Sequence, residues 1–236
     1  MKNKVLLVLT IFFTFLFVFS LFNIIRYIKN NKENKEIQEE TLLYVQEDDD
    51  KYSVNFKELL EQNEDTIAYL KVGGTNIDYI VVQASDNEYY LNHNFNKKYN
   101  VSGWIFSDYH NKFDGSDKNI VIYGHNTSDG SMFGTLKNTL NSDWQNSNNE
   151  IVLVTEVGTY YYQVFSTYTI EPEEYYINTS FTEEEFDSFI KELKKRSNHD
   201  YKVDVNYNDS ILTLSSCTVT GKKRVVLHAK LIKDVV

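Results

Sequence analysis

The chain opens with an apolar run from Val5 to Ile25 that contains no charged residue. At about 1.5 Å per residue, a helix of this length spans the roughly 30 Å hydrocarbon core of a bilayer. A cleaved signal peptide is the alternative, but its apolar stretch is usually only about 7 to 15 residues long. We therefore expect a transmembrane anchor at 5–25, after a cytoplasmic N-terminus at 1–4. Basic residues flank the run on both sides, so charge alone does not set its orientation.

Polar residues dominate the next segment, 26–52, which is rich in Lys, Glu, Asn and Asp. Because it lacks the apolar density needed to pack, we expect a solvated stalk that is partly helical. The folded domain then occupies 53–236. Its first element is predicted to be a short amphipathic helix at 55–62, where apolar residues recur at helical spacing.

Short β-prone runs recur through this domain and predict its strands. Tyr and Phe, present 18 and 15 times, stand in alternating runs such as 160–168, which favours pleated strands over a helical bundle. About eight strands with few helices are most simply arranged as a closed β-barrel, in a fold that is mainly β with helices. The strands are expected at 67–72, 77–83, 103–106, 119–123, 151–155, 159–170, 211–216 and 224–232.

One helix is predicted to be inserted between two of these strands, at 183–196. Thr182 and Glu185 have the spacing of a capping box, and Phe181 and Phe186 that of a hydrophobic staple. Apolar residues along the segment form a single stripe, which is typical of a helix packed on one face. Shorter helical segments are expected at 85–91 and 132–140.

Charge and composition exclude some functions. A formal net charge of -10, without an uninterrupted basic stripe, argues against a nucleic-acid partner. The single cysteine, Cys217, cannot form an intramolecular disulfide, and neither it nor the five histidines show metal-ligand spacing. We therefore expect no metal and no other cofactor. The lone thiol needs a different explanation.

Cys217 stands at the end of the strand predicted at 211–216, and His125 follows the strand predicted at 119–123. Two such strand ends can meet at one edge of a barrel, and a thiol nucleophile needs an imidazole to form the thiolate and later to protonate a leaving amine. Taken alone, each residue also fits a structural role, such as an inert buried thiol. His228 competes for the role of the base, but it lies inside a strand and is the weaker candidate.

Arg224 begins the last strand, seven residues after Cys217. A permanent cation beside the sulfur would lower the pKa of the thiol and stabilise an oxyanion. A surface charge that aids solubility is the alternative, which the neighbouring Lys222 and Lys223 support.

Three stretches, YGHN at 123–126, TLSSCT at 213–218 and RVVLHAKLI at 224–232, together resemble the sortase transpeptidases of Gram-positive bacteria, specifically class B. The likeness extends over most of 66–233, and the helix at 183–196 and an additional N-terminal helix match the class B elaborations of the sortase barrel. Three departures from the family pattern are Ile80, where relatives often carry Pro, Ser216, where Thr is commoner, and a short loop between Cys217 and Arg224.

The resemblance implies a mechanism. Cys217 attacks the Thr carbonyl of a C-terminal sorting signal, His125 acts as acid and base, and Arg224 steadies the peptide and the oxyanion. A thioacyl intermediate forms, and an amino group of a peptidoglycan precursor of the lipid II type resolves it. The reaction fixes a surface protein to the cell wall, and class B relatives generally recognise an Asn-Pro-x-Thr signal that is cleaved after Thr.

The resemblance also implies a location and a peptide groove. The protein is expected in the cell membrane, with a single span and its catalytic domain outside the cell. The residues expected to line the groove for the sorting signal are Asn87, Leu91, Tyr176, Ile177 and Ser215.

Two other functions compete with this interpretation. Another cell-wall cysteine peptidase or an L,D-transpeptidase would also use Cys, His and Arg, although the His-Gly-Cys type of signature is missing around Cys217. A non-catalytic, membrane-tethered β-barrel binding module with a buried thiol is the non-enzymatic alternative.

Overall fold

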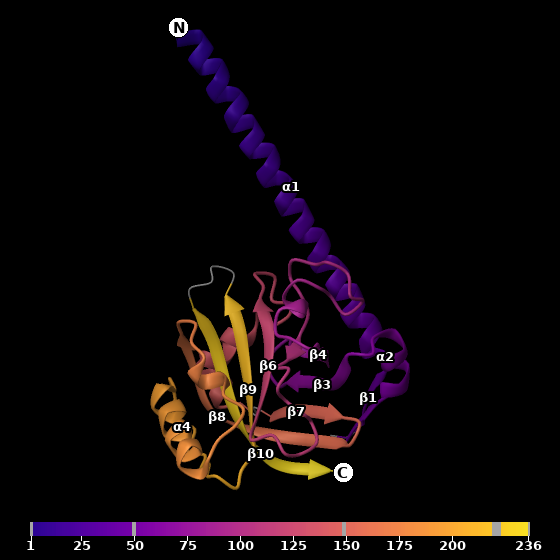
Figure 1. Cartoon of the computed structure of the whole chain (residues 1–236), viewed down its shortest axis with the longest axis vertical. Helices are drawn as coiled ribbons and strands as arrows, with labels where there is room; N and C mark the ends of the chain where they lie inside the picture. Colours follow the sequence, from indigo (N-terminus) through magenta and orange to yellow (C-terminus); the bar gives the residue numbers. More distant parts are fainter. Residues whose placement is uncertain (1, 49–50, 148–149, 219–222, 236) are drawn as a thin grey trace.

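The structure, a computed structural model, describes residues 2–48, 51–147, 150–218 and 223–235. Eight strands close into a barrel in the order β10-β8-β7-β3-β4-β5-β6-β9, and one long helix projects from it (Figure 1). The predicted eight-stranded barrel is therefore confirmed. Its strands are β3 (Thr66–Val72), β4 (Asp78–Val82), β5 (Phe106–Ser107), β6 (Asn119–Asn126), β7 (Glu150–Thr155), β8 (Gly158–Ile170), β9 (Ile211–Thr218) and β10 (Arg224–Val235).

The barrel has two parallel strand pairs, β4 with β5 and β6 with β9, whereas its other neighbours are antiparallel. Parallel neighbours need a long crossover between them. The crossover from β6 to β9 contains β7, β8 and the inserted helix. Because parallel strands run in the same direction, their C-terminal ends meet at the same edge of the barrel.

Apolar burial falls into two clusters. The larger one includes fully buried aliphatic side chains of the barrel strands, such as Leu70, Ile80 and Leu153. The second lies between the inserted helix α4 (Glu183–Arg196) and strands β8 and β10, and it includes the fully buried Phe186 and Leu193. Hydrophobic burial at roughly 25 cal/mol per Å² makes these two clusters the main source of stability.

The inserted helix α4 (Glu183–Arg196) has the predicted boundaries. Thr182 Oγ1 accepts a hydrogen bond from the Glu185 amide at 3.3 Å, and a Glu185 carboxylate oxygen accepts one from the Thr182 amide at 2.8 Å. The rings of Phe181 and Phe186 lie 5.4 Å apart, as a hydrophobic staple requires. The cap and the staple together fix where the helix begins.

The remaining short elements follow the sequence less closely. The strand expected at 103–106 is reduced to β5, because the Trp104 amide donates to the Tyr90 carbonyl instead of joining the ladder. A hairpin that begins in the expected stalk and ends at Val54 was not predicted, and its Val45 and Tyr52 side chains pack against the barrel core. The elements are the hairpin strands β1 (Val45–Asp48) and β2 (Lys51–Val54), the α-helices α2 (Phe56–Gln62) and α3 (Ser142–Gln145), and the 3-10 helices η1 (Tyr89–Leu91), η2 (Leu136–Leu140) and η3 (Tyr175–Ile177).

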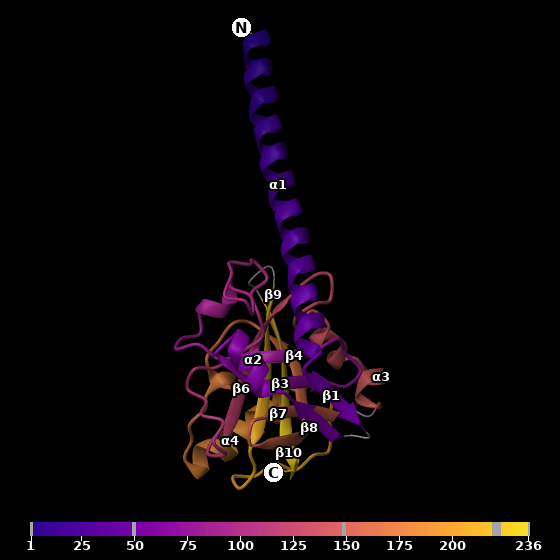
Figure 2. The same ribbon diagram turned by 90° about the vertical axis from the view of Figure 1, so that its right-hand side faces the viewer.

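The N-terminal helix α1 (Lys2–Leu42) is continuous for 41 residues. Its stretch Asn3–Leu42 contains a window that is apolar and long enough to cross a membrane, with a mean hydropathy of 2.8 and none of its residues buried. Figures 1 and 2 both show this part of α1 standing clear of the barrel. The boundaries 1–4, 5–25, 26–52 and 53–236 remain a prediction.

The second part of α1 is not wholly solvated, in contrast to the expectation for the stalk. Asn34 is almost fully buried, and its side-chain amide donates to the Gly103 carbonyl at 3.0 Å. Asn100 returns a hydrogen bond to Asn34 Oδ1 at 2.8 Å, and Gln38 donates to the Asp78 carbonyl at 2.7 Å. Hydrogen-bonded polar side chains thus supplement Ile37, which this part of α1 buries in the barrel core.

We expect Asn34→Ala to loosen the contact between α1 and the barrel. The substitution leaves the buried Gly103 carbonyl without its Asn34 donor and removes one of the two hydrogen bonds that the Asn100 amide donates, which costs about 1–3 kcal/mol. Hydrogen exchange of the full-length chain should show faster exchange at residues 30–42. Glu40→Ala, an exposed position on the same helix, is the control, and equal exchange in the two variants would contradict the role of Asn34.

Candidate active site

The ladder between β6 and β9 brings two of the predicted site residues together. Position 125 pairs with position 217 across these parallel strands, as 123 pairs with 215 and 124 with 216. Neighbouring strands lie about 4.8 Å apart. His125 and Cys217 are therefore adjacent in the sheet, although they are 92 residues apart in the chain (217 − 125). The side chain of Cys217 lies outside the part of the chain that the structure describes, so its placement rests on the strand register.

His125 is half-buried, and its ring is oriented by the backbone. Its Nε2 atom lies 2.8 Å from the Leu91 carbonyl oxygen. A carbonyl oxygen only accepts, so Nε2 carries a proton, and in the neutral ring Nδ1 is the basic nitrogen. Gly124, just before it, is required by packing, because a Cβ atom there would lie 2.5 Å from Ile105 and 2.8 Å from Phe133.

Arg224 opens β10, which is antiparallel to β9. Val226, two residues after Arg224, pairs with Ser215, two residues before Cys217, so Arg224 and Cys217 lie toward the same end of this strand pair. The Arg224 guanidinium donates from Nη1 to the Tyr176 hydroxyl at 3.1 Å. All three predicted catalytic positions therefore lie at one edge of the barrel.

The Tyr176 hydroxyl links this edge to the inserted segment. Tyr176 is fully buried in η3, and its oxygen lies 3.1 Å from Ser215 Oγ as well as 3.1 Å from the Arg224 guanidinium. One hydroxyl thus joins η3 to both β9 and β10. The Ser216 hydroxyl, beside Cys217 in the chain, accepts a hydrogen bond from the Val225 amide at 3.0 Å.

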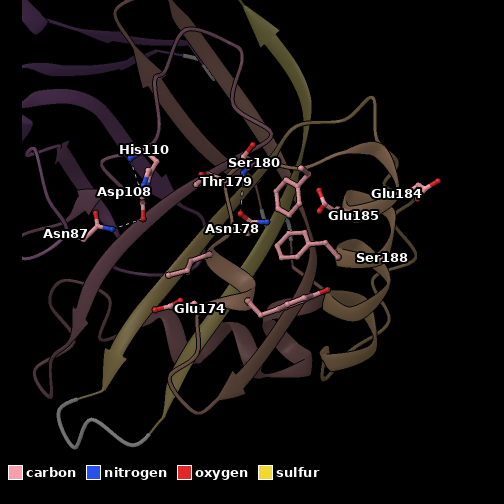
Figure 3. Close-up of a pocket in the computed structure, with 14 residues that line it drawn as sticks. Asn87, Asp108, His110, Glu174, Asn178, Thr179, Ser180, Glu184, Glu185 and Ser188 are labelled. Atoms are coloured by element: carbon pink, nitrogen blue, oxygen red, sulfur yellow. Dashed lines mark hydrogen bonds and ion pairs between the residues drawn. The ribbon is translucent and has the colours of Figure 1, made fainter.

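The predicted groove residues divide into two groups. Leu91, Tyr176 and Ser215 contact the predicted catalytic residues or each other, as described above. Asn87 and Ile177 lie farther along, on the wall of a cavity of about 1110 Å³ that Figure 3 shows between the loop around Asp108 and the segment before α4. This cavity is lined by Asn87, Asp108, His110, Glu174, Tyr175, Ile177, Asn178, Thr179, Ser180, Phe181, Glu184, Glu185, Ser188 and Phe189.

Asp108 organises the near wall of this cavity, and sequence reasoning gave it no role. One carboxylate oxygen accepts from Asn87 and the Tyr123 hydroxyl, both at 2.8 Å (Figure 3 shows the first bond). The other accepts from the His110 amide at 3.0 Å and lies 2.7 Å from the His110 ring. The one signal in the sequence is an acidic residue two positions after the apolar run 104–106.

Electrostatics keep Asp108 charged and Tyr123 neutral. Burial raises the pKa of Asp108, but the hydrogen bonds that it accepts, led by the one from the His110 amide, outweigh burial and lower this pKa. Burial and then the Asp108 charge raise the pKa of Tyr123, while Arg224 opposes them. The phenol therefore remains a hydrogen-bond donor to the carboxylate.

His228, the weaker candidate base, is fully buried. One ring nitrogen lies 2.9 Å from the Tyr168 hydroxyl, and the other lies 2.8 Å from the Thr213 hydroxyl. Burial, with a smaller contribution from Arg196, lowers the pKa of His228 to about 3. The ring is therefore a neutral part of the core. Among the described residues, no three His, Cys, Asp or Glu side chains are grouped so that they could hold a metal ion.

Comparison with known proteins gives consistent matches. Residues 70–232 match the family model described as the sortase domain. The chain is 35% identical over 180 residues to sortase B of Listeria monocytogenes, covering 75% of this chain and 73% of the relative. The corresponding values for sortase B of Staphylococcus aureus are 33% over 182 residues, with 75% of each chain covered.

Solved structures of sortase B are also similar to this chain. The crystal structure of Clostridium perfringens sortase B is 38% identical and covers 76% of this chain and all of its own, with a TM-score of 0.72. Sortase B of Bacillus anthracis, in complex with AAEK1, is 32% identical and covers 87% of this chain and 99% of its own, with a TM-score of 0.79.

We expect His228 to make stability depend on pH. Above pH 6.5 the ring is neutral in both the folded and the unfolded chain. As the pH falls towards 3, only the unfolded chain binds the proton, so the free energy of unfolding decreases by about 1.4 kcal/mol per pH unit from this residue. Denaturant unfolding of the full-length chain between pH 7 and pH 4 should show a shallower decrease for His228→Gln. His199→Gln is the control, and an unchanged slope in His228→Gln would contradict the assignment.

Proposed function

This chain belongs to the class B sortases, which are cysteine transpeptidases of cell-wall sorting, and from that premise we propose that Cys217, His125 and Arg224 are its catalytic residues. The observation that carries the proposal is the pairing of position 125 with position 217 in the parallel ladder. The hydrogen bond from Arg224 to Tyr176 supports it, because that bond holds the cation at the same edge.

In the proposed first step, Nδ1 of His125 accepts the proton of the Cys217 thiol, and the resulting thiolate attacks the carbonyl carbon of the signal's Thr. The resulting oxyanion is stabilised by the guanidinium of Arg224. His125 then protonates the departing amine, the C–N bond breaks, and a thioacyl bond to Cys217 remains. Because Nε2 of His125 is committed to the Leu91 carbonyl, we assign the proton transfer to Nδ1.

In the second step, an amino group of a peptidoglycan precursor attacks the thioacyl carbon. His125 removes its proton, the C–S bond breaks, and the surface protein becomes joined to the precursor by a new amide bond. We propose a precursor of the lipid II type as this acceptor. Anchoring of the chain by 5–25, with a single span and the domain outside the cell, would place the enzyme and a lipid-linked acceptor in the same membrane.

We further propose that the signal is of the Asn-Pro-x-Thr type and is cleaved after Thr. With Thr at Cys217, the preceding residues of the signal would lie over Leu91, Tyr176 and Ser215 and reach the wall that carries Asn87 and Ile177. Asn87 donates one hydrogen bond to Asp108, and its side-chain oxygen accepts from the Tyr109 amide at 3.1 Å. Its amide is thus held in a fixed orientation, as selective recognition of a peptide requires.

The other two functions are less well supported. A non-catalytic binding module does not fit membership of a family of transpeptidases. A cysteine peptidase or L,D-transpeptidase of another fold is disfavoured by the match over 70–232 to the sortase domain.

We expect the full-length chain, incubated in detergent with an Asn-Pro-x-Thr peptide, to gain the mass of the acyl fragment at Cys217. Mass spectrometry should detect no adduct for Cys217→Ala, and His125→Ala should slow cleavage by at least about 100-fold. His199→Ala is a matched control, because the His199 ring also contacts a backbone carbonyl, that of Leu140, at 2.7 Å. An adduct on another residue, or equal rates for the two histidine variants, would refute the assignment.

Tyr176→Phe should lower kcat/KM for the same peptide by roughly 10-fold, because hydrogen bonds to charged groups contribute about 1.5–3 kcal/mol. The variant keeps the buried ring and removes only the hydroxyl that holds the Arg224 guanidinium. Tyr201→Phe is the control, because it also loses a phenol oxygen that lies 2.9 Å from another hydroxyl, that of Thr167, but that contacts no predicted site residue. Similar kinetics for the two variants would show that the hydroxyl does not position Arg224.

A further inference from the structure

The distance between the apolar part of α1 and the barrel is short. The apolar run ends at Ile25, yet the guanidinium of Arg26 already lies over the ring of Tyr99, 4.8 Å from its centre. The Tyr27 hydroxyl lies 3.3 Å from the hydroxyl of Ser128. The barrel loops therefore contact α1 within two residues of the end of the apolar run, which is about 3 Å along the helix axis.

Loops this close to the end of the apolar run cannot avoid contact with the bilayer. Its hydrocarbon core is about 30 Å thick and its full thickness about 40–45 Å, so the headgroup layer on each side is roughly 5–7 Å deep. The backbone of Arg26 and Tyr27, about 3 Å beyond the hydrocarbon boundary, falls inside this layer. Because helical side chains tilt toward the N-terminus, the loop atoms that they contact lie at this height or nearer the hydrocarbon core. Any tilt of α1 shortens the rise further.

The contact is also held at a fixed height. The loop that carries Tyr99 is tied to α1 by Asn100, whose side-chain amide donates to the Asn30 carbonyl at 3.0 Å and to Asn34 at 2.8 Å. On the other loop, Asp129 accepts from Asn31 at 2.7 Å. These buried or half-buried polar bonds lock both loops to the helix.

The chemistry of the Tyr99 loop suits a headgroup layer. In this loop, Tyr99 and Val101 are 55% and 38% exposed, and Lys98 is exposed as well. Tyrosine is enriched at membrane interfaces, and basic side chains are attracted to anionic lipids. The neighbouring loop carries one exposed carboxylate, Asp129, which accepts a hydrogen bond from Asn31 and so lies against α1.

We propose that the loop 98–101 lies in the headgroup layer, so that the barrel rests directly on the bilayer rather than at the end of a free stalk. The inference rests on the anchor in the proposed function. It also orients the site, because Figures 1 and 2 both show the C-terminal end of β9 on the side of the barrel from which α1 emerges. The edge with His125 and Cys217 thus faces the membrane.

Spin labelling tests this arrangement in the full-length chain. With Cys217→Ala as background, a nitroxide is attached to Tyr99→Cys, or to Val101→Cys as a second site, in vesicles of phosphatidylcholine and phosphatidylglycerol. Val157→Cys is the matched control, because Val157 is also 55% exposed but lies in the turn between β7 and β8. Phe15→Cys reports on the anchor itself.

Power saturation should give label 99 a ratio of oxygen to nickel-complex accessibility roughly three-fold or more above that of label 157, since oxygen concentrates in the bilayer and the complex in water. Equal ratios at 99, 101 and 157, with label 15 in the hydrocarbon core, would overturn the inference and leave the anchor intact. A water-exposed label 15 would overturn both. Protection of label 99 that depends on the protein-to-lipid ratio would indicate a second copy instead and would also overturn it.

Discussion

The hydrogen-bond ladder between β6 and β9 is the constraint on which the rest of the site depends. Parallel pairing sets the ends of these strands side by side, and its register makes positions 125 and 217 neighbours. Parallel strands cannot be joined by a tight turn. The crossover between them holds β7, β8, η3 and α4, so the same connection that permits the pairing also supplies the tyrosine that contacts Arg224.

Much of this architecture was predictable because it depends on local apolar patterns. The barrel strands follow β-prone runs, and α4 follows its cap, staple and stripe. The positions of Cys217, His125 and Arg224 at strand ends predicted that they meet at one edge, and the register agrees with that prediction for the backbone. Their catalytic roles stay a prediction that the experiments above address.

Two features that the sequence did not indicate, the docking of α1 and the contacts of Asp108, depend on polar interactions. The docking of α1 relies on buried amides such as Asn34, whose partners are distant in the chain, and a segment rich in Asn, Lys and Glu has no apolar stripe to signal it. Asp108 is similar, since its four donors come from three separate segments. The helical segment expected at 85–91 is only the 3-10 helix η1. Ser85 has capping-box spacing to Glu88, but Asp86 accepts from the Glu88 and Tyr89 amides instead.

The three residues of η3 make different contacts, and the difference separates the lining of the cavity from the support of Arg224. Tyr176 is buried and fastened to Ser215 and Arg224, whereas Tyr175 and Ile177 on either side line the cavity. Substitutions at the two outer positions therefore alter the shape offered to a substrate while the middle one keeps the charged group in place. In the proposed groove, the two peptide-facing side chains can thus be exchanged independently of the phenol that anchors the guanidinium.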